Sequence, residues 1–447
     1  MSFPRYEKYK DSGVEWLGEV PEEWEVVPIK LIGRLKGGAG FPHGEQGVEG
    51  EELSFHKVNA LGQANGDGVL LPSENTISRE TASRLGAFIF PPKAIVFAKV
   101  GAALLLGRIR TISEAACLDN NMMGLVVNEE SHVVNFIRYA MDLVRFDLIA
   151  NPGAVPSLNE AQIGNFHLVI PQKTEQRTIA AFLDHETGKI DALVAEQEKL
   201  IGLLKEKRQA VISHTVTKGL DPNARMKDSG VEWLGEVPEG WEVVRLGNLF
   251  FEANESGNDN LPILQVSIHH GVSDKELDES EMDRKVARSE DRSKYKRVQP
   301  GDLAYNMMRA WQGGFGTVTV PGQISPAYIV ARPQKHIVTE FVEHVLRTPR
   351  AVEEMRRFSR GVTDFRLRLY WDEFKNIRIA VPPLEEAEKI CGHIHRITVR
   401  FDSLRNSSEQ SIALLQERRT ALISAAVAGK IDVRGYEAAR TEAQEAV

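Results

Sequence analysis

The chain has 447 residues, of which 42% are hydrophobic and 26% charged, and its formal net charge is −8. This length allows about three domains at ~150 residues each. No run of ~18 apolar residues occurs, which argues against a membrane-spanning helix, and the first residues (MSFPRYEKYKDSG) lack the apolar core of a signal peptide. We therefore expect a cytoplasmic protein. Taken alone, the acidic balance disfavours nucleic-acid binding, although binding depends on how Lys and Arg are distributed.

One 18-residue segment occurs twice. Residues 10–27, KDSGVEWLGEVPEEWEVV, return at 227–244 as KDSGVEWLGEVPEGWEVV, and we call these segments box 1 and box 2. Such a repeat indicates a duplicated structural unit, two equivalent docking surfaces, or both, and we favour both. The tryptophans of the boxes are predicted to anchor local cores, with the docking of one partner copy on each box as a second role: Trp16, Trp24, Trp233 and Trp241.

After box 1 comes a variable region, the first insert (residues 28–157). Short apolar runs at 94–100 (AIVFAKV) and 122–127 (MMGLVV) predict strands of a mixed sheet. Apolar residues at helical spacing over 131–149 predict one helix there, ended by Asn151, Pro152 and Gly153. The first insert is therefore expected to be a globular α+β domain.

The next region, residues 158–222, has a helical character. We predict a short helix over 175–185, a joint at Gly188 and a long amphipathic helix over 189–216, of ~28 residues or about 42 Å. The expected apolar seam of the long helix has a spacing of three and four: Ile190, Leu193, Gln197, Leu200, Leu204 and Val211, with Val194, Ile201 and Ile212 widening the stripe.

The same order then repeats, with box 2 and a second insert in 223–368, a second helical region at 369–433 and a tail at 434–447. At an offset of 211, residues 198–216 and 409–427 are identical at 10 of 19 positions, whereas the inserts diverge. Because neither long helix can bury its seam alone, we expect the two to form an antiparallel coiled coil that joins two globular α+β domains around a pseudo-two-fold axis. A plain structural hairpin is the alternative.

This layout resembles the specificity subunit of type I restriction–modification systems over essentially the whole chain. The motifs that carry the resemblance are the boxes, NFHLVIPQKTEQRTIAAFLDHETGKIDALVAEQEKLIGLLKEKRQAVIS, and DEFKNIRIAVPPLEEAEKI followed by LLQERRTALISAAVAGKI. Ala387 and Glu388 depart from the usual Glu-Gln of the family. The resemblance implies that the inserts are target-recognition domains, each for one half of a split target in double-stranded DNA, and that the helices set the gap.

The resemblance also implies the partners. Two methyltransferase (M) subunits would dock on the conserved regions and methylate adenines with S-adenosylmethionine, and restriction (R) subunits would join with ATP and Mg. The chain itself is expected to hold no cofactor, no metal and no catalytic residue. Two other interpretations stay open: a standalone restriction or methylation enzyme with fused recognition halves, and a non-catalytic two-fold protein adaptor.

Motifs for catalysis are missing from the sequence. The segment Asn151-Pro152-Gly153 is the nearest match to the Pro-Pro-aromatic motif of adenine methyltransferases and fails it, and no GxxxxGK[ST] loop is present. His393 and His395 are two apart on a predicted helix and point away from each other, which suits a metal poorly. Cys117 and Cys391 are expected to be small buried or idle thiols.

DNA contacts are predicted where Arg, Lys, Asn, Gln or His follow apolar runs, since these side chains pair with base edges. The residues of the first insert are Lys57, Asn59, Lys99, Arg108, Asn120 and Asn121, and those of the second are Gln265, His269, Asn306, Arg309 and Gln312. Residues 284–297 carry seven basic residues against two acidic ones. Replacing Arg292, Lys294 and Lys296 there is predicted to weaken binding to all DNA sequences and to flatten the salt slope by up to about three units.

Overall fold

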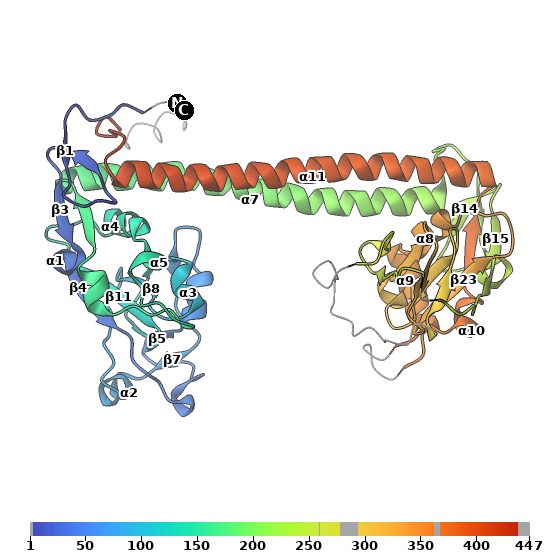
Figure 1. The fold of residues 1–447 in the computed structure, drawn as a ribbon, viewed down its shortest axis with the longest axis horizontal. Helices are drawn as coiled ribbons and strands as arrows, with labels where there is room; N and C mark the ends of the chain where they lie inside the picture. Colours follow the sequence, from blue (N-terminus) through green and yellow to red (C-terminus); the bar gives the residue numbers. More distant parts are fainter. Residues whose placement is uncertain (1–2, 259, 278–293, 362–366, 437–447) are drawn as a thin grey trace. The chain divides into compact units, whose positions relative to one another are not determined.

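The computed structural model describes residues 3–258, 260–277, 294–361 and 367–436 (Figure 1). Contacts divide the chain into two compact units: unit 1 is Met1–Glu198 with Glu409–Val447, and unit 2 is Lys199–Ser408. Each unit combines one box and one insert with part of helix α7 (Lys173–Lys218) and part of helix α11 (Leu384–Val427). Within the described residues, none of the helices has both the length and the apolar character needed to cross a membrane.

The repeat of the sequence is also a repeat of the backbone. In unit 1, β1 (Tyr9–Asp11) pairs with β2 (Glu19–Pro21), and β3 (Glu25–Pro28) pairs with β12 (His167–Ile170). In unit 2, β13 (Met226–Asp228) pairs with β14 (Glu236–Pro238), and β15 (Glu242–Arg245) pairs with β24 (Arg378–Val381). The strand pairs are antiparallel and have the same register in both units, so each box folds with a strand of its own helical region.

Each box is closed by the end of a long helix. Gly219, just after α7, and Gly429, just after α11, both have positive φ, of 77° and 69°, which favours glycine. A Cβ at Gly429 would lie 2.4 Å from Pro21 of box 1, and one at Gly219 would lie 3.5 Å from Trp241 of box 2. Box 1 therefore packs on the helix that comes last in the sequence, and box 2 packs on the end of α7.

Helix α7 is continuous, so the predicted joint at Gly188 is wrong. A glycine inside a helix costs only about 1 kcal/mol relative to alanine, which packing in unit 1 offsets. The predicted seam is partly wrong as well, because Leu193 and Leu200 are 47% and 41% exposed. Ile190 is buried, and Val194 and Ile201, which belong to the widened part of the predicted stripe, are half-buried.

The two long helices run antiparallel in each unit. In unit 1, Arg419 of α11 donates to Asp191 of α7 through Nε (2.9 Å) and Nη2 (3.3 Å). In unit 2, Nη1 of Arg208 in α7 donates to Asp402 of α11 (3.1 Å). At the offset of 211, Asp191 corresponds to Asp402 and Arg208 to Arg419, so the two units contain the same ion pair with the roles of the helices exchanged.

The first insert is built on two sheets. The larger sheet has the order β4 (Gly33–Gly37), β11 (Met122–Val127), β8 (Ile95–Ala98), β9 (Arg110–Ile112), β6 (Val69–Leu70), and the smaller has β10 (Ala116–Leu118), β5 (Leu53–His56), β7 (Thr76–Ile77). Strands predicted at 94–100 and 122–127 are thus confirmed as β8 and β11. The short helices are η1 (His43–Glu45), η2 (Val58–Gly62), α2 (Arg79–Arg84) and α3 (Ala102–Leu105).

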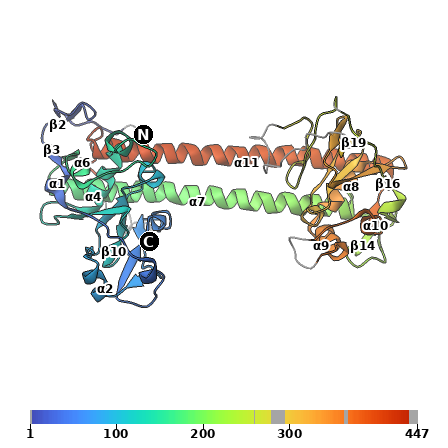
Figure 2. The same cartoon turned by 60° about the horizontal axis from the view of Figure 1, so that its bottom comes forward.

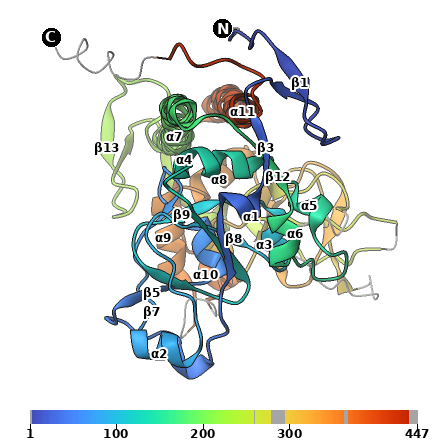
Figure 3. The same ribbon diagram turned by 90° about the vertical axis from the view of Figure 1, so that its left-hand side faces the viewer.

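The single helix predicted over 131–149 is wrong. The segment forms α4 (Val134–Ala140), η3 (Met141–Leu143) and α5 (Phe146–Ile149), because the backbone at Val144 is extended (ψ 114°). Val144 and Phe146 are buried in the unit 1 core beside this break. Helix α4 lies alongside α7 (Figure 3), where the Tyr139 hydroxyl donates to Asp184 (2.8 Å).

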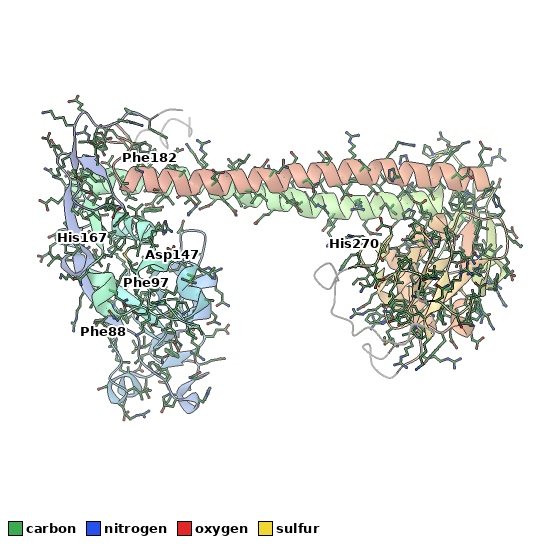
Figure 4. The ribbon with its side chains drawn as sticks, in the orientation of Figure 1. Phe88, Phe97, Asp147, His167, Phe182 and His270 are labelled. Atoms are coloured by element: carbon green, nitrogen blue, oxygen red, sulfur yellow. The ribbon has the colours of Figure 1, made fainter. Side chains whose placement is uncertain are left out.

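The first insert meets its frame where helix α1 (Ile29–Ile32) lies against helix α6 (Glu160–Gly164). The two helices lie side by side (Figures 2 and 3), and the Ile29 N–H donates to the carbonyl of Phe166 (2.9 Å). Asn159 begins α6 with a capping box formed with Gln162. Within the frame, Phe3 packs edge-on against Phe182 of α7, with ring centroids 5.3 Å apart; Phe182 is labelled in Figure 4.

The second insert has a four-stranded antiparallel sheet in the order β16 (Phe250–Glu252), β23 (Tyr328–Pro333), β20 (Leu303–Asn306), β21 (Phe315–Thr317). Two small pairs accompany it, β17 (Val266–Ser267) with β18 (Gly271–Val272) and β19 (Lys296–Val298) with β22 (Gly322–Ile324). The helices of the insert are η4 (Leu246–Asn248), η6 (Ala310–Gln312), α8 (Thr339–Leu346) and α9 (Pro349–Phe358), and α10 (Trp371–Phe374) follows at the start of the second helical region. The rings of Tyr305 and Phe315 in the insert pack with the ring of Phe374 in α10, and all three are buried.

Candidate nucleic-acid interface

In the first insert, one edge of the larger sheet gathers predicted base-contacting residues. Strands β8 and β11 are antiparallel, with Ala98 opposite Met122, so the end of β8 lies beside the start of β11. Lys99 follows β8 and Asn121 precedes β11, and the Lys99 N–H donates to the Asn121 carbonyl (2.8 Å). Arg108 precedes β9, which pairs with β8 on its other side, so its backbone reaches the same edge.

The smaller sheet adds Lys57 and Asn120 to this edge. Strands β5 and β10 are parallel, and the Asp119 N–H donates to the carbonyl of His56 (2.9 Å). Lys57 therefore lies next to the turn that holds Asn120. Gly38 permits this arrangement, because a Cβ there would lie 2.1 Å from the Asp119 carbonyl oxygen.

Asn59 is the remaining predicted DNA-contacting residue of the first insert, and it lies in η2, directly after Lys57 and Val58. A Cβ at Gly62, the last residue of η2, would lie 2.8 Å from a guanidinium nitrogen of Arg108, which brings η2 up to Arg108. All six predicted residues of the first insert thus lie at one end of its sheets, and we call this group the first edge. Asn59, Arg108 and Asn120 are exposed, whereas Lys57 donates to Gln46 (2.6 Å).

Next to the first edge, the His56 ring and the Cys117 thiol are uncharged because both are buried. Burial lowers the pKa of His56, which keeps its ring neutral, and the nearby Glu114 only partly opposes this. Burial raises the pKa of the Cys117 thiol to about 11. Cys391 in unit 2 is likewise free and buried, and burial raises its pKa to about 12. Neither thiol is therefore a nucleophile at neutral pH.

In the second insert, the turn between β20 and β21 brings three predicted residues together. Asn306 ends β20, and its side-chain oxygen accepts from the Met308 N–H (3.0 Å). Arg309 donates through Nη1 to the side-chain oxygen of Gln312 (2.9 Å), and Gln312 is exposed. The turn therefore presents an Arg–Gln pair whose remaining donors are suited to base edges or phosphates.

His269 and Gln265 belong to the neighbouring hairpin of β17 and β18. Arg347 holds its turn by donating through Nη2 to the carbonyls of Ile268 (2.8 Å) and His269 (2.9 Å). His269 and His270 are both exposed, and His270 is labelled in Figure 4. Gln265 is half-buried, and its backbone pairs with Ser273.

The basic run at 284–297 lies only partly within the described residues. Arg292 is outside them. Lys294 is exposed, whereas Lys296 is in β19 with a side chain 18% exposed and its Nζ 3.8 Å from Glu252 Oε1. The prediction of a phosphate contact at Lys296 therefore needs correction, because this side chain already has an anionic partner inside the fold. The prediction for the patch then rests on Arg292 and Lys294.

The docking role predicted for the box tryptophans needs a similar correction. Trp24 and Trp241 are 1% exposed and Trp233 is 8% exposed, so these side chains lie in the cores, where a partner does not reach them. Trp16 is different, because it is 40% exposed and stacks on Phe166 with ring centroids 4.7 Å apart. Trp16 alone among the four presents surface to a partner.

Sequence reasoning missed a basic cavity in unit 1. Three of its arginines, Arg110, Arg138 and Arg419, come from segments that are separate in the sequence, so no local pattern predicts that they meet. Among the described residues, no group of three or more His, Cys, Asp or Glu is arranged to hold a metal ion.

Comparison with known proteins agrees with this architecture. Residues 21–200 match the family model of the type I restriction modification DNA specificity domain. The EcoBI specificity subunit of Escherichia coli is 24% identical over 340 residues, which is 71% of this chain and 70% of that protein. The EcoKI specificity subunit of Escherichia coli K12 is 21% identical over 443 residues, which is 93% of this chain and 90% of that protein.

Solved structures show the same fold. One solved chain, from a study of complex assembly in a type I restriction–modification system, superposes on this chain with a TM-score of 0.64 at 15% sequence identity. The superposition covers 91% of this chain and 98% of the solved chain. The HsdS subunit of Thermoanaerobacter tengcongensis has a TM-score of 0.51 at 16% identity, with 92% of this chain and 98% of that chain covered. The matched segment, residues 21–200, is similar to a DNA specificity domain. The chain is therefore similar, in sequence and in fold, to type I restriction–modification specificity subunits.

Proposed function

We propose that this chain is the DNA-specificity subunit of a type I restriction–modification complex and has no catalytic activity of its own. Each insert recognises one half of a bipartite target in double-stranded DNA. Adenine methylation with S-adenosylmethionine belongs to two M subunits, and the steps that use ATP and Mg belong to R subunits. The complex works in the cytoplasm.

The main support is the contrast between frame and inserts. The strand pairs β3–β12 and β15–β24 have the same register, and the ion pair of the long helices occurs once in each unit. The inserts differ in sheet order and in the residues that they present. A duplicated frame with unlike inserts suits a protein that reads two different half-sites with one architecture.

In the proposed arrangement, α7 and α11 form an antiparallel coiled coil that sets the gap between the half-sites. Asp191–Arg419 and Arg208–Asp402 support this pairing, because one helix register satisfies both ion pairs. In unit 1, the exposed Leu193 of α7 and Trp16 of box 1 are apolar surface on which an M subunit can dock.

An exchange of the first insert tests the proposal. Residues 28–157 are replaced by the corresponding insert of another family member, and the chain is produced with its M subunits in a host without other methyltransferases. Sequencing of methylated adenines should show one half of the target changed, with the other half and the gap kept. The reciprocal exchange of residues 245–368 is the matched control and should change the other half. A change in both halves, or methyl transfer by the purified chain alone, contradicts the proposal.

A further inference from the structure

Unit 1 contains a cavity of about 980 Å³ between the first insert and the two long helices. Arg110 and Arg138 come from the insert, whereas Arg419 and Lys430 come from α11 and the segment after it. The full set of charged residues in its wall has six cations and three carboxylates: Arg108, Arg110, Arg138, Arg145, Arg419 and Lys430, with Asp142, Asp191 and Glu198. The cavity therefore has an excess of positive charge.

The hydrogen bonds of Arg110 go to neutral acceptors, and Arg138 has a long ion pair. Arg110 donates through Nε to the Leu61 carbonyl (3.2 Å) and through Nη1 to that of Ile109 (2.8 Å), and both acceptors are neutral. Arg138 is 11% exposed and lies over the ring of Tyr139 at 4.0 Å. Its Nη2 is 3.7 Å from Asp184 Oδ1, too far for a good hydrogen bond.

The electrostatics of the cavity show the same excess. Burial lowers the pKa of Arg110, and the charges of Arg108, Arg138 and Arg419 lower it further, against Asp142 alone. Confined like charges in a desolvated site are unfavourable unless an anion joins them. Arginine is well suited to bind such an anion, since its planar guanidinium can donate two parallel hydrogen bonds to the oxygens of a phosphate.

We propose that this cavity binds a phosphate group, held by Arg110, Arg138 and Arg419, with Lys430 at its rim. The phosphate belongs either to the DNA backbone or to a free phosphate ester. The first source is geometrically direct, because Arg108 belongs both to the first edge and to the cavity wall. Residues from the end of the sequence would then take part in binding at the first insert. The site does not rest on the proposed sequence recognition, since its ligand can be tested without DNA.

The repeat supplies a matched pair of variants. Arg419→Gln and Arg208→Gln each break the same ion pair between the long helices, but only Arg419 lines the cavity. Inorganic pyrophosphate is titrated into the full chain at low ionic strength by isothermal titration calorimetry. We expect one site per chain, an affinity at least tenfold lower in Arg419→Gln, and an affinity within twofold of the unsubstituted chain in Arg208→Gln.

Further variants guard against a folding defect in Arg419→Gln. Lys430 is exposed, and Lys430→Gln should lower the affinity about threefold without changing the circular dichroism spectrum or melting temperature. Arg110→Gln should lower it at least fivefold. The inference is overturned if the unsubstituted chain does not bind pyrophosphate, if Arg208→Gln and Arg419→Gln lose the same affinity, or if Lys430→Gln and Arg110→Gln both bind normally.

A competition experiment identifies the source of the phosphate. The chain with its M subunits is saturated with pyrophosphate, and a duplex carrying its methylation target is then added. Displacement of pyrophosphate assigns the site to the DNA backbone, and simultaneous binding assigns it to a free phosphate ester. The two proposals fail separately: a chain that binds pyrophosphate but selects no DNA sequence refutes the proposed function alone, and selective DNA binding without a pyrophosphate site refutes this inference alone.

Discussion

Box 1 and box 2 have nearly the same sequence and the same backbone, yet their tryptophans have different partners. The Trp241 Nε1–H donates to Glu386 at the start of α11 (3.1 Å), whereas Trp24 Nε1 is buried with no acceptor among the described residues. The residue that corresponds to Glu386 at the offset of 211 is Glu175. In unit 1, Glu175 accepts instead from the hydroxyl of Tyr6 (2.7 Å).

The two boxes thus share a backbone conformation, but the side-chain hydrogen bonds of their tryptophans differ. Tyr6 precedes box 1, and the equivalent position before box 2 is Asn223, which cannot replace the phenol. Burial and the bond to Glu175 raise the pKa of Tyr6, so the phenol stays protonated and remains the donor. One residue outside the repeated segment thus redirects the carboxylate that both units share.

The inserts show a second contrast, between two carboxylates among arginines. Asp302 in unit 2 is 2% exposed and accepts from Arg332 through Nε (2.9 Å) and Nη2 (3.0 Å). Asp142 in unit 1 faces the cavity near Arg110, Arg138 and Arg419, and none of the hydrogen bonds found among the described residues involves its carboxylate. Asp302 is therefore fixed by Arg332 through two hydrogen bonds, whereas Asp142 lies near arginines without such bonds.

The largest effect is expected at Asp302. Asp302→Asn leaves Arg332 without its bidentate partner inside the fold, so unit 2 should lose about 3 kcal/mol of stability. Native-state hydrogen exchange of the β20 and β23 amides measures the loss, and the β8 and β11 amides of unit 1 are the internal control. Glu255→Gln is the matched variant, because Glu255 binds the same arginine from a half-exposed position and should cost no more than about 1 kcal/mol. If the two variants lose the same free energy of unfolding, the buried Asp302–Arg332 pair stabilises unit 2 no more than the exposed Glu255–Arg332 pair does.

A smaller effect separates the two boxes. Trp241→Phe removes a hydrogen bond to a carboxylate, but Trp24→Phe removes a nitrogen that has no acceptor, so the first should cost about 1 kcal/mol more than the second. Exchange of the β15–β24 amides in one variant and of the β3–β12 amides in the other gives the two free energies. Tyr6→Phe sharpens the comparison, since it should destabilise unit 1 alone. If the two tryptophan variants cost the same, the contrast drawn from Glu175 and Glu386 fails.

Much of the frame was predictable from the sequence because repeated segments have local patterns. The boxes, β8, β11 and the end of α7 follow from apolar spacing, Gly and Pro. The joint at Gly188 was wrong because tertiary packing overrides the helix propensity of one residue. The break at Val144 was missed because the apolar spacing continues through it while the backbone does not.

One part of the candidate site was predictable from the sequence and another part was not. The first edge was predictable because each of its residues follows or precedes a strand, and strand ends meet at a sheet edge. The cavity was not, since Arg110, Arg138 and Arg419 meet only through the contact of the insert with the end of α11. Lys296 was assigned to DNA because a basic run does not reveal that Glu252 lies opposite it.

The smallest expected effect concerns the pH dependence of unit 1. Burial raises the pKa of Asp142 from 3.8 to about 6, although Arg138, Arg419 and Arg110 lower it. The folded unit therefore binds a proton between pH 6 and 3.8 that the unfolded chain does not bind. The stabilisation from this proton is complete below the unfolded-state pKa and is lost as the pH rises through about 6.

Asp142→Asn tests this assignment, because asparagine stays neutral at every pH. The substitution should stabilise unit 1 at pH 7.5 and have little effect at pH 4, as measured by the exchange of its β8 and β11 amides at each pH. It should also strengthen sulfate binding at pH 7.5, since sulfate keeps its charge across this range and the variant removes one competing carboxylate from the cavity. Asp147→Asn is the control, because Asp147 is exposed and paired with Arg145 (2.8 Å) outside the arginine group. If Asp142→Asn destabilises unit 1 equally at both pH values, the carboxylate is a structural partner like Asp302, and the contrast between the two inserts disappears.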